Sequence, residues 1–181
     1  MVRTRVGYAG GTKKNPTYYN LGNHTETIQL DYDPTQISYE ELLAIFWDSH
    51  NPAKPPFSRQ YQSIIFYHNE EQKRLAMESK AREEARRKVK VLTEIIPAGE
   101  FYLAEDYHQK YYLQLVPELR KEFSAIYPDI NDFIASTAAA RVNGYAGGYG
   151  TVATLQEEID DFGLSPAAKE KLLRLVSSSE N

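Results

Sequence analysis

The chain has 181 residues, 41% of them hydrophobic and 25% charged, which indicates a soluble globular protein of one domain with an appended C-terminal segment. Its formal net charge of −4 argues against broad nucleic-acid binding, and the lack of a long apolar run or a signal-peptide core favours a cytoplasmic protein over a membrane protein. The absence of cysteine excludes disulfides, thiolate metal sites and every thiol mechanism for this chain.

Two strands and a helix are predicted in the first fifty residues. Residues 2–8 alternate in polarity and are followed by a glycine turn, which predicts a strand. Residues 25–32 alternate again and predict a half-buried strand, with a polar loop between the two. Ser38 and Glu41 have the spacing of a capping box, which predicts a helix with one apolar face and with Trp47 in the core.

The middle of the chain predicts a loop, two strands and a charged helix. Residues 51–58 contain three prolines and predict an irregular loop, and the apolar run at 62–67 predicts a central strand. Asn69 can cap a long helix that continues to about Lys88. Its opposite charges at i, i+4 indicate a solvated surface rather than a binding face. Another strand is predicted at 89–96.

The last third of the chain predicts helices. One helix is expected from Ala104, with a break at Pro117. The glycine-rich residues 143–150 predict a flexible, turn-rich stretch. Ser165 and Pro166 have the types favoured at the N-cap and first position of a helix, so they predict the start of a final helix.

This order of elements predicts an α+β fold, a two-layer sandwich with a mixed sheet. We expect a core domain over residues 1–115 and a helical C-terminal extension over residues 116–181.

The candidate site residues are polar side chains in or near the predicted loops. They are Tyr18, His24, Glu26, Tyr61, Asp106 and His108. None of them forms a catalytic motif by itself. Glu26 suits a general acid, and an exposed carboxylate on a strand face is the alternative. The four histidines lack the spacing of metal ligands, so no metal site is expected.

Eight short segments occur in order and with consistent spacing over residues 2–113. They are Val6 to Gly11, Asn15 to Tyr18, His24 to Glu26, Tyr32 to Pro34, Ser38 to Leu43, Phe46-Trp47, Ser63 to His68, and Pro97 through Gln109. Together these segments resemble the peptide-methionine (S)-S-oxide reductase family, methionine sulfoxide reductase A. A single segment would be weak support, but eight in sequence are hard to obtain by chance.

The resemblance implies a mechanism and a set of roles. In that family a cysteine thiolate attacks the sulfoxide sulfur, a glutamate protonates the sulfoxide oxygen, and two tyrosines hydrogen-bond to that oxygen. The resemblance implies that Glu26 is the acid, that Tyr18 and Tyr61 are the donors, and that His24 belongs to the substrate-binding site. It also implies that no cofactor is needed, that the substrates are proteins containing methionine sulfoxide, and that thioredoxin reduces a full-length form.

The chain departs from the family pattern in three places. The Gly-Cys-Phe-Trp motif expected ahead of Val6, with its strand and helix, is missing. Pro56 replaces an acidic residue, and Ala146 lies in a segment where the family often has a resolving cysteine. We therefore expect a truncated form that is inactive as given. The alternatives are a non-catalytic relative that binds oxidised-methionine peptides or a protein partner, and a structural domain without a sulfoxide pocket.

Overall fold

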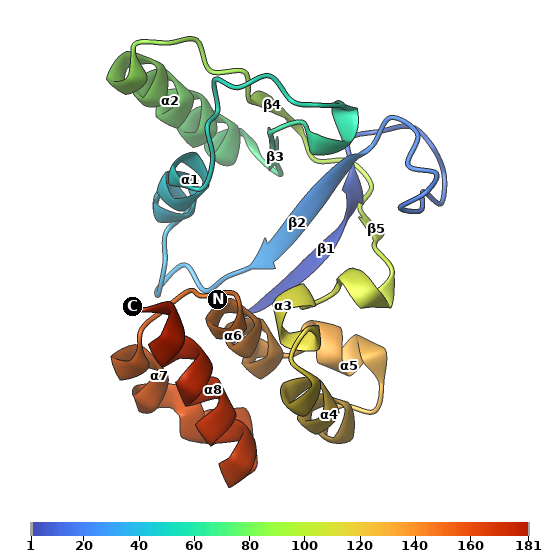
Figure 1. Cartoon of the computed structure of the whole chain (residues 1–181). Coiled ribbons are helices and arrows are strands. Elements are labelled where there is room, and N and C mark those ends of the chain that lie inside the picture. The colour runs from blue at the N-terminus through green and yellow to red at the C-terminus, as the bar shows by residue number, and fades with distance from the viewer. Residues whose placement is uncertain (1, 181) are drawn as a thin grey trace. The chain divides into compact units, whose positions relative to one another are not determined.

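The computed structural model describes residues 2–180 and divides the chain into two compact units (Figure 1). Within the described residues, the first unit comprises residues 2–5, 29–31 and 105–180, and the second unit comprises residues 6–28 and 32–104. Both helices and strands are present, which confirms the predicted α+β class. The predicted domain boundary at residue 115 stays a prediction.

A three-stranded sheet has the order β2-β1-β5. Its strands are β1 (Arg3–Ala9), β2 (Thr25–Asp31) and β5 (Tyr102–Leu103), so both strands predicted in the first part of the chain are confirmed. β1 and β5 are antiparallel, and Tyr8 lies opposite Tyr102. Tyr8 is buried, and its side chain forms part of a small apolar core beside the sheet.

A second sheet consists of the parallel strands β3 (Ile64–Tyr67) and β4 (Glu94–Pro97). Among the residues that the structure describes, β3 pairs with β4 alone, which differs from the predicted central position. β4 is also shorter than predicted. The reason is that residues 89–93 form hydrogen bonds with loops and helices and not with another strand. For example, the Leu92 amide donates to the Pro52 carbonyl at 2.8 Å.

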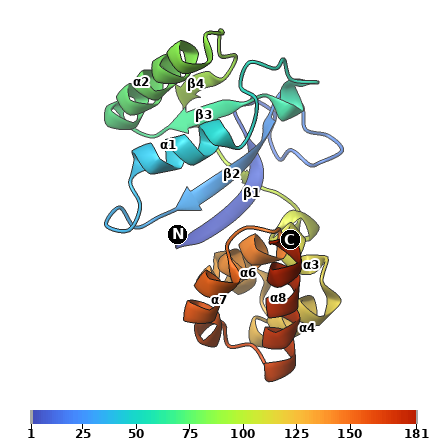
Figure 2. The ribbon, with the colours of Figure 1, turned by 60° about the vertical axis from the view of Figure 1, so that its left-hand side comes forward.

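Two helices, α1 (Tyr39–Asp48) and α2 (Glu70–Arg87), pack against each other, and α2 also packs against β3 and β4 (Figure 2). The capping box predicted for α1 is confirmed, because the Glu41 amide donates to Ser38 Oγ at 3.2 Å and the Ser38 amide donates to Glu41 Oε2 at 2.7 Å. The two helices and the second sheet share one apolar core. Its buried members are Leu43, Trp47, Ile65, Ala76 and Val91.

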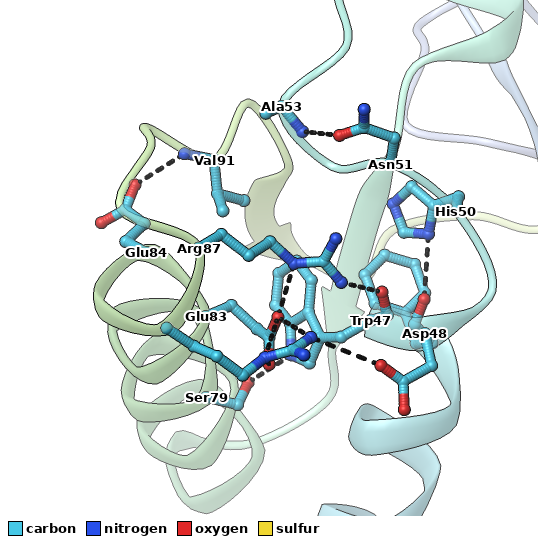
Figure 3. Close-up of polar contacts among 12 residues, drawn as sticks. Trp47, Asp48, His50, Asn51, Ala53, Ser79, Glu83, Glu84, Arg87 and Val91 are labelled. Carbon is cyan, nitrogen blue, oxygen red and sulfur yellow. Dashed lines mark hydrogen bonds and ion pairs between the residues drawn. The ribbon is translucent and has the colours of Figure 1, made fainter.

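Trp47 joins α1 to α2, as predicted for a core residue. Its side chain is 2% exposed, and its Nε1–H donates to Ser79 Oγ at 3.0 Å (Figure 3). Arg87 donates to the Trp47 carbonyl at 2.8 Å and pairs with Glu83 at 2.7 Å. Glu83 and Arg87 thus form one of the opposite-charge pairs at i, i+4 on this helix, and Arg87 serves the α1–α2 packing as well as the helix surface.

The first unit contains helices that pack around a separate apolar core. They are α3 (Tyr111–Gln114), α4 (Pro117–Ile126), α5 (Ile130–Ala135), α6 (Thr137–Ala146), α7 (Val152–Glu158) and α8 (Pro166–Ser179). Phe123, Val142 and Leu172 are each 0% exposed in this core. No helix in the described part of the chain is long and apolar enough to span a membrane.

One predicted helix start is confirmed, and one prediction is wrong in part. Ser165 Oγ accepts from the Ala168 amide at 3.3 Å to cap α8, as predicted. At Pro117, where a break was predicted, the new helix α4 begins. The turn predicted at 143–150 is instead helical as far as residue 146. The reason is that Ser136 caps α6 through the Ala139 amide, and Val142 and Tyr145 are buried on one face of that helix.

The helix predicted from Ala104 is interrupted at Lys110, whose backbone is left-handed with a φ of 48°. The Lys110 side chain is 3% exposed. Its Nζ donates to Thr4 Oγ1 at 2.9 Å, to the Ile134 carbonyl at 3.0 Å and to the Thr4 carbonyl. Burial, and secondarily the nearby Arg5 charge, lower the pKa of Lys110 to about 8.

Candidate functional site

The structure brings three of the predicted site residues together in the second unit. Tyr61 ends a short helical turn, η1 (Arg59–Tyr61), and its phenol hydrogen-bonds to the phenol of Tyr18. This hydrogen bond, followed by the electrostatic effects of Tyr18 and Glu26, raises the pKa of Tyr61 above its usual value. Tyr61 is 51% exposed and Glu26 is also exposed, so the cluster faces solvent.

Tyr18 lies on the loop between β1 and β2, and His24 holds that loop in place. The Gly11 amide donates to His24 Nδ1 at 3.1 Å, so Nδ1 accepts and the hydrogen is on Nε2, which donates to the Lys13 carbonyl at 2.8 Å. A Cβ atom on Gly11 would lie 2.6 Å from His24 Cγ, so the close approach requires glycine.

The contacts of His24 are therefore those of a loop anchor. Its side chain is 1% exposed, and both ring nitrogens are bonded to loop backbone. Its ring also packs edge-on against Tyr102, with a centroid distance of 5.4 Å. The direct binding of substrate by His24 stays a prediction.

Glu26 and Tyr61 are joined by contacts between β2 and η1. Gln60 Nε2 donates to Glu26 Oε1 at 2.6 Å. The adjacent Thr25 is buried, and its hydroxyl donates to the Arg59 carbonyl at 2.9 Å. Arg59 also pairs with Glu94 of β4 at 2.6 Å, so η1 is fixed to both sheets.

Gln60, Thr25 and Arg59 were not singled out from the sequence. Gln60 and Glu26 lie 34 positions apart, as do Thr25 and Arg59. Neither the spacing nor the residue types signal that such pairs meet. The one available signal is that each residue is adjacent to a predicted site residue in sequence.

Asp106 and His108, the other two candidates, lie in the first unit. They belong to η2 (Asp106–His108), where the His108 ring lies 4.2 Å from the ring of Tyr107. The Asp106 carbonyl accepts from Gln114 Nε2 at 2.9 Å. These contacts hold the turn together. No group of three or more histidine, aspartate and glutamate side chains that could hold a metal occurs within residues 2–180.

The clustered side chains define what the site can do chemically. Two phenols can donate hydrogen bonds and a carboxyl group can supply a proton, which suits a ligand oxygen that gains negative charge. With no cysteine in the chain, the cluster lacks a thiol nucleophile. The roles of Tyr18 and Tyr61 as donors and of Glu26 as an acid stay predictions.

Comparisons with known proteins identify the family of the chain. The family model described as "Peptide methionine sulfoxide reductase" matches residues 1–142, and one described as "Selenoprotein methionine sulfoxide reductase A, helical domain" matches residues 130–172. A peptide methionine sulfoxide reductase of Drosophila melanogaster is 41% identical over 99% of this chain and 73% of its own length. Peptide methionine sulfoxide reductase A5 of Oryza sativa is 43% identical over 81% of this chain and 59% of its own length.

Solved structures show the same similarity. Methionine sulfoxide reductase A of Corynebacterium diphtheriae superimposes with a TM-score of 0.54 and 33% identity, over 64% of each chain. Reduced Mxr1 from Saccharomyces cerevisiae superimposes with a TM-score of 0.58 and 28% identity, over 63% of this chain and 71% of that one. The chain thus spans between about three fifths and three quarters of these relatives. By both sequence and fold, the chain belongs to the methionine sulfoxide reductase A family.

Proposed function

We propose that this chain forms the oxygen-binding half of a site for methionine S-sulfoxide in proteins, and that it takes part in the reduction of that group. Membership of the methionine sulfoxide reductase A family supports the reaction class. The single observation that carries the proposal is the cluster of Tyr18, Tyr61 and Glu26: the Tyr61 phenol hydrogen-bonds to that of Tyr18, and Gln60, adjacent to Tyr61, donates to Glu26 Oε1 at 2.6 Å.

Each side chain has a distinct role in the proposed site. The phenols of Tyr18 and Tyr61 donate hydrogen bonds to the sulfoxide oxygen, which becomes more basic as the sulfur is attacked. A tyrosine phenol is protonated at neutral pH, so Tyr61 can act as a donor there. Glu26 supplies a proton to the oxygen as the sulfur–oxygen bond breaks. His24 positions the loop that carries Tyr18.

The electrons come from thiols that these 181 residues do not contain. Reduction of a sulfoxide requires two electrons, and two thiols supply them by forming a disulfide while the oxygen leaves as water. We propose thioredoxin as the final source of these electrons. The chain by itself does not turn over, because the attacking species in this chemistry is a thiolate.

Binding to small sulfoxides tests the proposed site. Isothermal titration calorimetry would compare the S and R epimers of N-acetyl-methionine sulfoxide methylamide with the unoxidised compound. We expect the S epimer to bind most tightly. Tyr61→Phe and Tyr18→Phe should each weaken its binding about 2- to 10-fold, which is the effect of losing one hydrogen bond. Tyr19→Phe is the matched control, because Tyr19 is adjacent to Tyr18 and 90% exposed. Equal affinities for all three compounds would overturn the proposal.

Turnover tests the role of the missing thiol. With dithiothreitol as reductant, the purified chain should reduce methionine S-sulfoxide no faster than the reductant alone. Clear turnover by a pure sample would show that the reaction needs no protein thiol, and that part of the proposal would be wrong.

A further inference from the structure

A hollow of about 440 Å³ lies beside the site in the second unit, with Tyr61 in its wall. We call it the proline hollow, after its apolar lining of Pro52, Pro55, Pro56, Phe57, Tyr61 and Leu92. Its volume falls within the range of roughly 300–1,000 Å³ that is typical of ligand pockets. The hollow shares the side chain of Tyr61 with the cluster of Tyr18, Tyr61 and Glu26.

The wall of the proline hollow is held in shape by local bonds. The Leu92 amide donates to the Pro52 carbonyl at 2.8 Å, which joins the loop at 51–58 to the segment before β4. Asn51 Oδ1 accepts from the Ala53 amide at 3.1 Å (Figure 3). The three prolines further restrict the backbone of the loop. The hollow is therefore formed before any ligand binds.

Three polar side chains that line the hollow, those of His50, Gln62 and Ser63, are already hydrogen-bonded. His50 Nδ1 donates to the Phe46 carbonyl at 2.9 Å, which leaves Nε2 to accept from Ser63 Oγ at 2.9 Å. Ser63 Oγ is also 2.9 Å from Thr93 Oγ1. Gln62 Nε2 donates to two backbone carbonyls. Because these groups have partners, the occupant gains little from adding hydrogen bonds here, and an apolar occupant fits best.

Two side chains that line the hollow, those of Phe57 and Lys54, are exposed. Phe57 is 95% exposed, so a bound apolar group would remove ring surface from water. Lys54 is also exposed and lines the hollow, and it forms no ion pair within the described residues 2–180. Its charge is complementary to a carboxylate on the ligand.

We propose that the proline hollow binds an apolar side chain next to the oxidised methionine of a substrate peptide, and that Lys54 favours an acidic residue beside it. The inference rests on the proposed function, because Tyr61 would contact both the sulfoxide oxygen and this neighbouring side chain. The site thus selects sequences that pair methionine sulfoxide with a leucine- or phenylalanine-sized residue and a nearby carboxylate.

Peptide binding tests this selectivity. Short capped peptides would carry methionine S-sulfoxide with either leucine or glycine at the adjacent positions, on the N-terminal side in one set and the C-terminal side in another. In one of the two sets, fluorescence anisotropy should show that the leucine peptide binds about ten-fold more tightly than the glycine peptide, as expected for burying much of a leucine side chain.

Variants of residues that line the hollow test whether the hollow causes the preference for leucine over glycine peptides. Phe57→Ala should bring the leucine-to-glycine affinity ratio close to one, and Phe57→Leu should keep most of it. Met77→Ala is the matched control, because Met77 is 56% exposed on α2 and does not line the hollow; it should leave the ratio unchanged. The wild type should bind a peptide with glutamate about 2- to 5-fold more tightly than one with lysine. Lys54→Glu should reverse this preference by a similar factor.

The outcomes separate the two proposals. If the small S-sulfoxide binds while leucine and glycine peptides bind equally in both sets, the inference about the hollow is overturned and the proposed function stands. A leucine-to-glycine ratio that survives Phe57→Ala would likewise overturn the inference and leave the proposed function standing. If neither the small sulfoxide nor any peptide binds, the proposed function fails and this inference fails with it.

Discussion

The side-chain amide of Gln60 donates a hydrogen bond of 2.6 Å to Oε1 of Glu26, although the two residues lie 34 positions apart in the chain. The bond engages one carboxylate oxygen and leaves Oε2 for a ligand. It also places the residue that precedes Tyr61 directly against β2. Gln60 is therefore a positioning residue, because it fixes Glu26 relative to Tyr61 without itself being assigned to the sulfoxide oxygen.

Replacing Gln60 by leucine should weaken binding of the small S-sulfoxide about 2- to 10-fold, because the Glu26 carboxylate loses the donor that orients it. Gln60→Asn keeps an amide but on a shorter side chain, so its affinity should lie between that of Gln60→Leu and that of the wild type. Isothermal titration calorimetry measures both. Gln36→Leu, a change of the same type at an exposed position, should have no effect. Unchanged affinity in Gln60→Leu would show that Glu26 needs no such support.

Thr25→Val should destabilise the protein by about 1 kcal/mol, because the valine has nearly the same shape but cannot donate to the Arg59 carbonyl. Since η1 carries Tyr61, binding of the S-sulfoxide should also weaken. Urea denaturation gives the free energy of unfolding, and titration gives the affinity. Thr17→Val, at an exposed position, is the control for stability. A loss of stability with full affinity would mean that this bond does not position Tyr61.

Ser79→Ala should destabilise the protein by about 1–3 kcal/mol, because it leaves the buried Nε1–H of Trp47 without its acceptor. Trp47→Phe removes that donor, so adding Ser79→Ala to Trp47→Phe should cost less than Ser79→Ala does alone. A double-mutant cycle of urea unfolding free energies measures the difference. Ser124→Ala is the control, because its hydroxyl bonds to the Arg120 carbonyl at an exposed site. Strictly additive effects would contradict the coupling.

Lys110 should make the free energy of unfolding rise between about pH 8 and pH 10.5. Its pKa is about 8 in the folded protein and ordinarily 10.5, so below pH 8 the amine is charged in both states and the cost of burying the charge is present in full. As the pH rises past 8, the folded state releases the proton first and this cost disappears. The gain is on the order of 3 kcal/mol at most.

Lys110→Met should remove this pH-dependent gain, and at every pH it also leaves the Thr4 and Ile134 carbonyls without their donor. The quantity to compare is the slope of unfolding free energy against pH in the two proteins, measured by urea denaturation. Lys121→Met, at an exposed lysine, should keep the wild-type slope. Identical slopes in wild type and Lys110→Met would refute the lowered pKa.

The sequence predicted those parts of the fold that depend on neighbouring residues. The capping box of Ser38 and Glu41 and the Ser165 cap are local patterns, and each was confirmed. β2 is a strand as predicted, but its burial does not follow the predicted alternation, because Ile28 is 58% exposed. The helical character of residues 143–146 was missed because glycine and alanine dominate that stretch, while burial of Val142 and Tyr145 decides it. The division of the strands into two sheets likewise depends on pairing between distant segments.

The site was predictable only in part, and for the same reason. Tyr18, Glu26 and Tyr61 followed from the resemblance to a family, since nothing in their spacing shows that they meet. Gln60 and Thr25 act through contacts across 34 positions, which no local pattern reveals. The proline hollow depends on how a loop folds back against the segment before β4, so its existence could not be inferred from the three prolines alone.

The imidazole of His24 joins the two ends of the loop that carries Tyr18, with Gly11 and Lys13 at one end and His24 itself at the other. These bonds close the loop at its base, so the loop backbone loses its conformational freedom when the protein folds and not when a ligand binds. Tyr18 is hydrogen-bonded to Tyr61 before a ligand binds. Binding of a sulfoxide there therefore costs little conformational entropy of the protein. Association at this site should therefore be limited by encounter and not by loop closure.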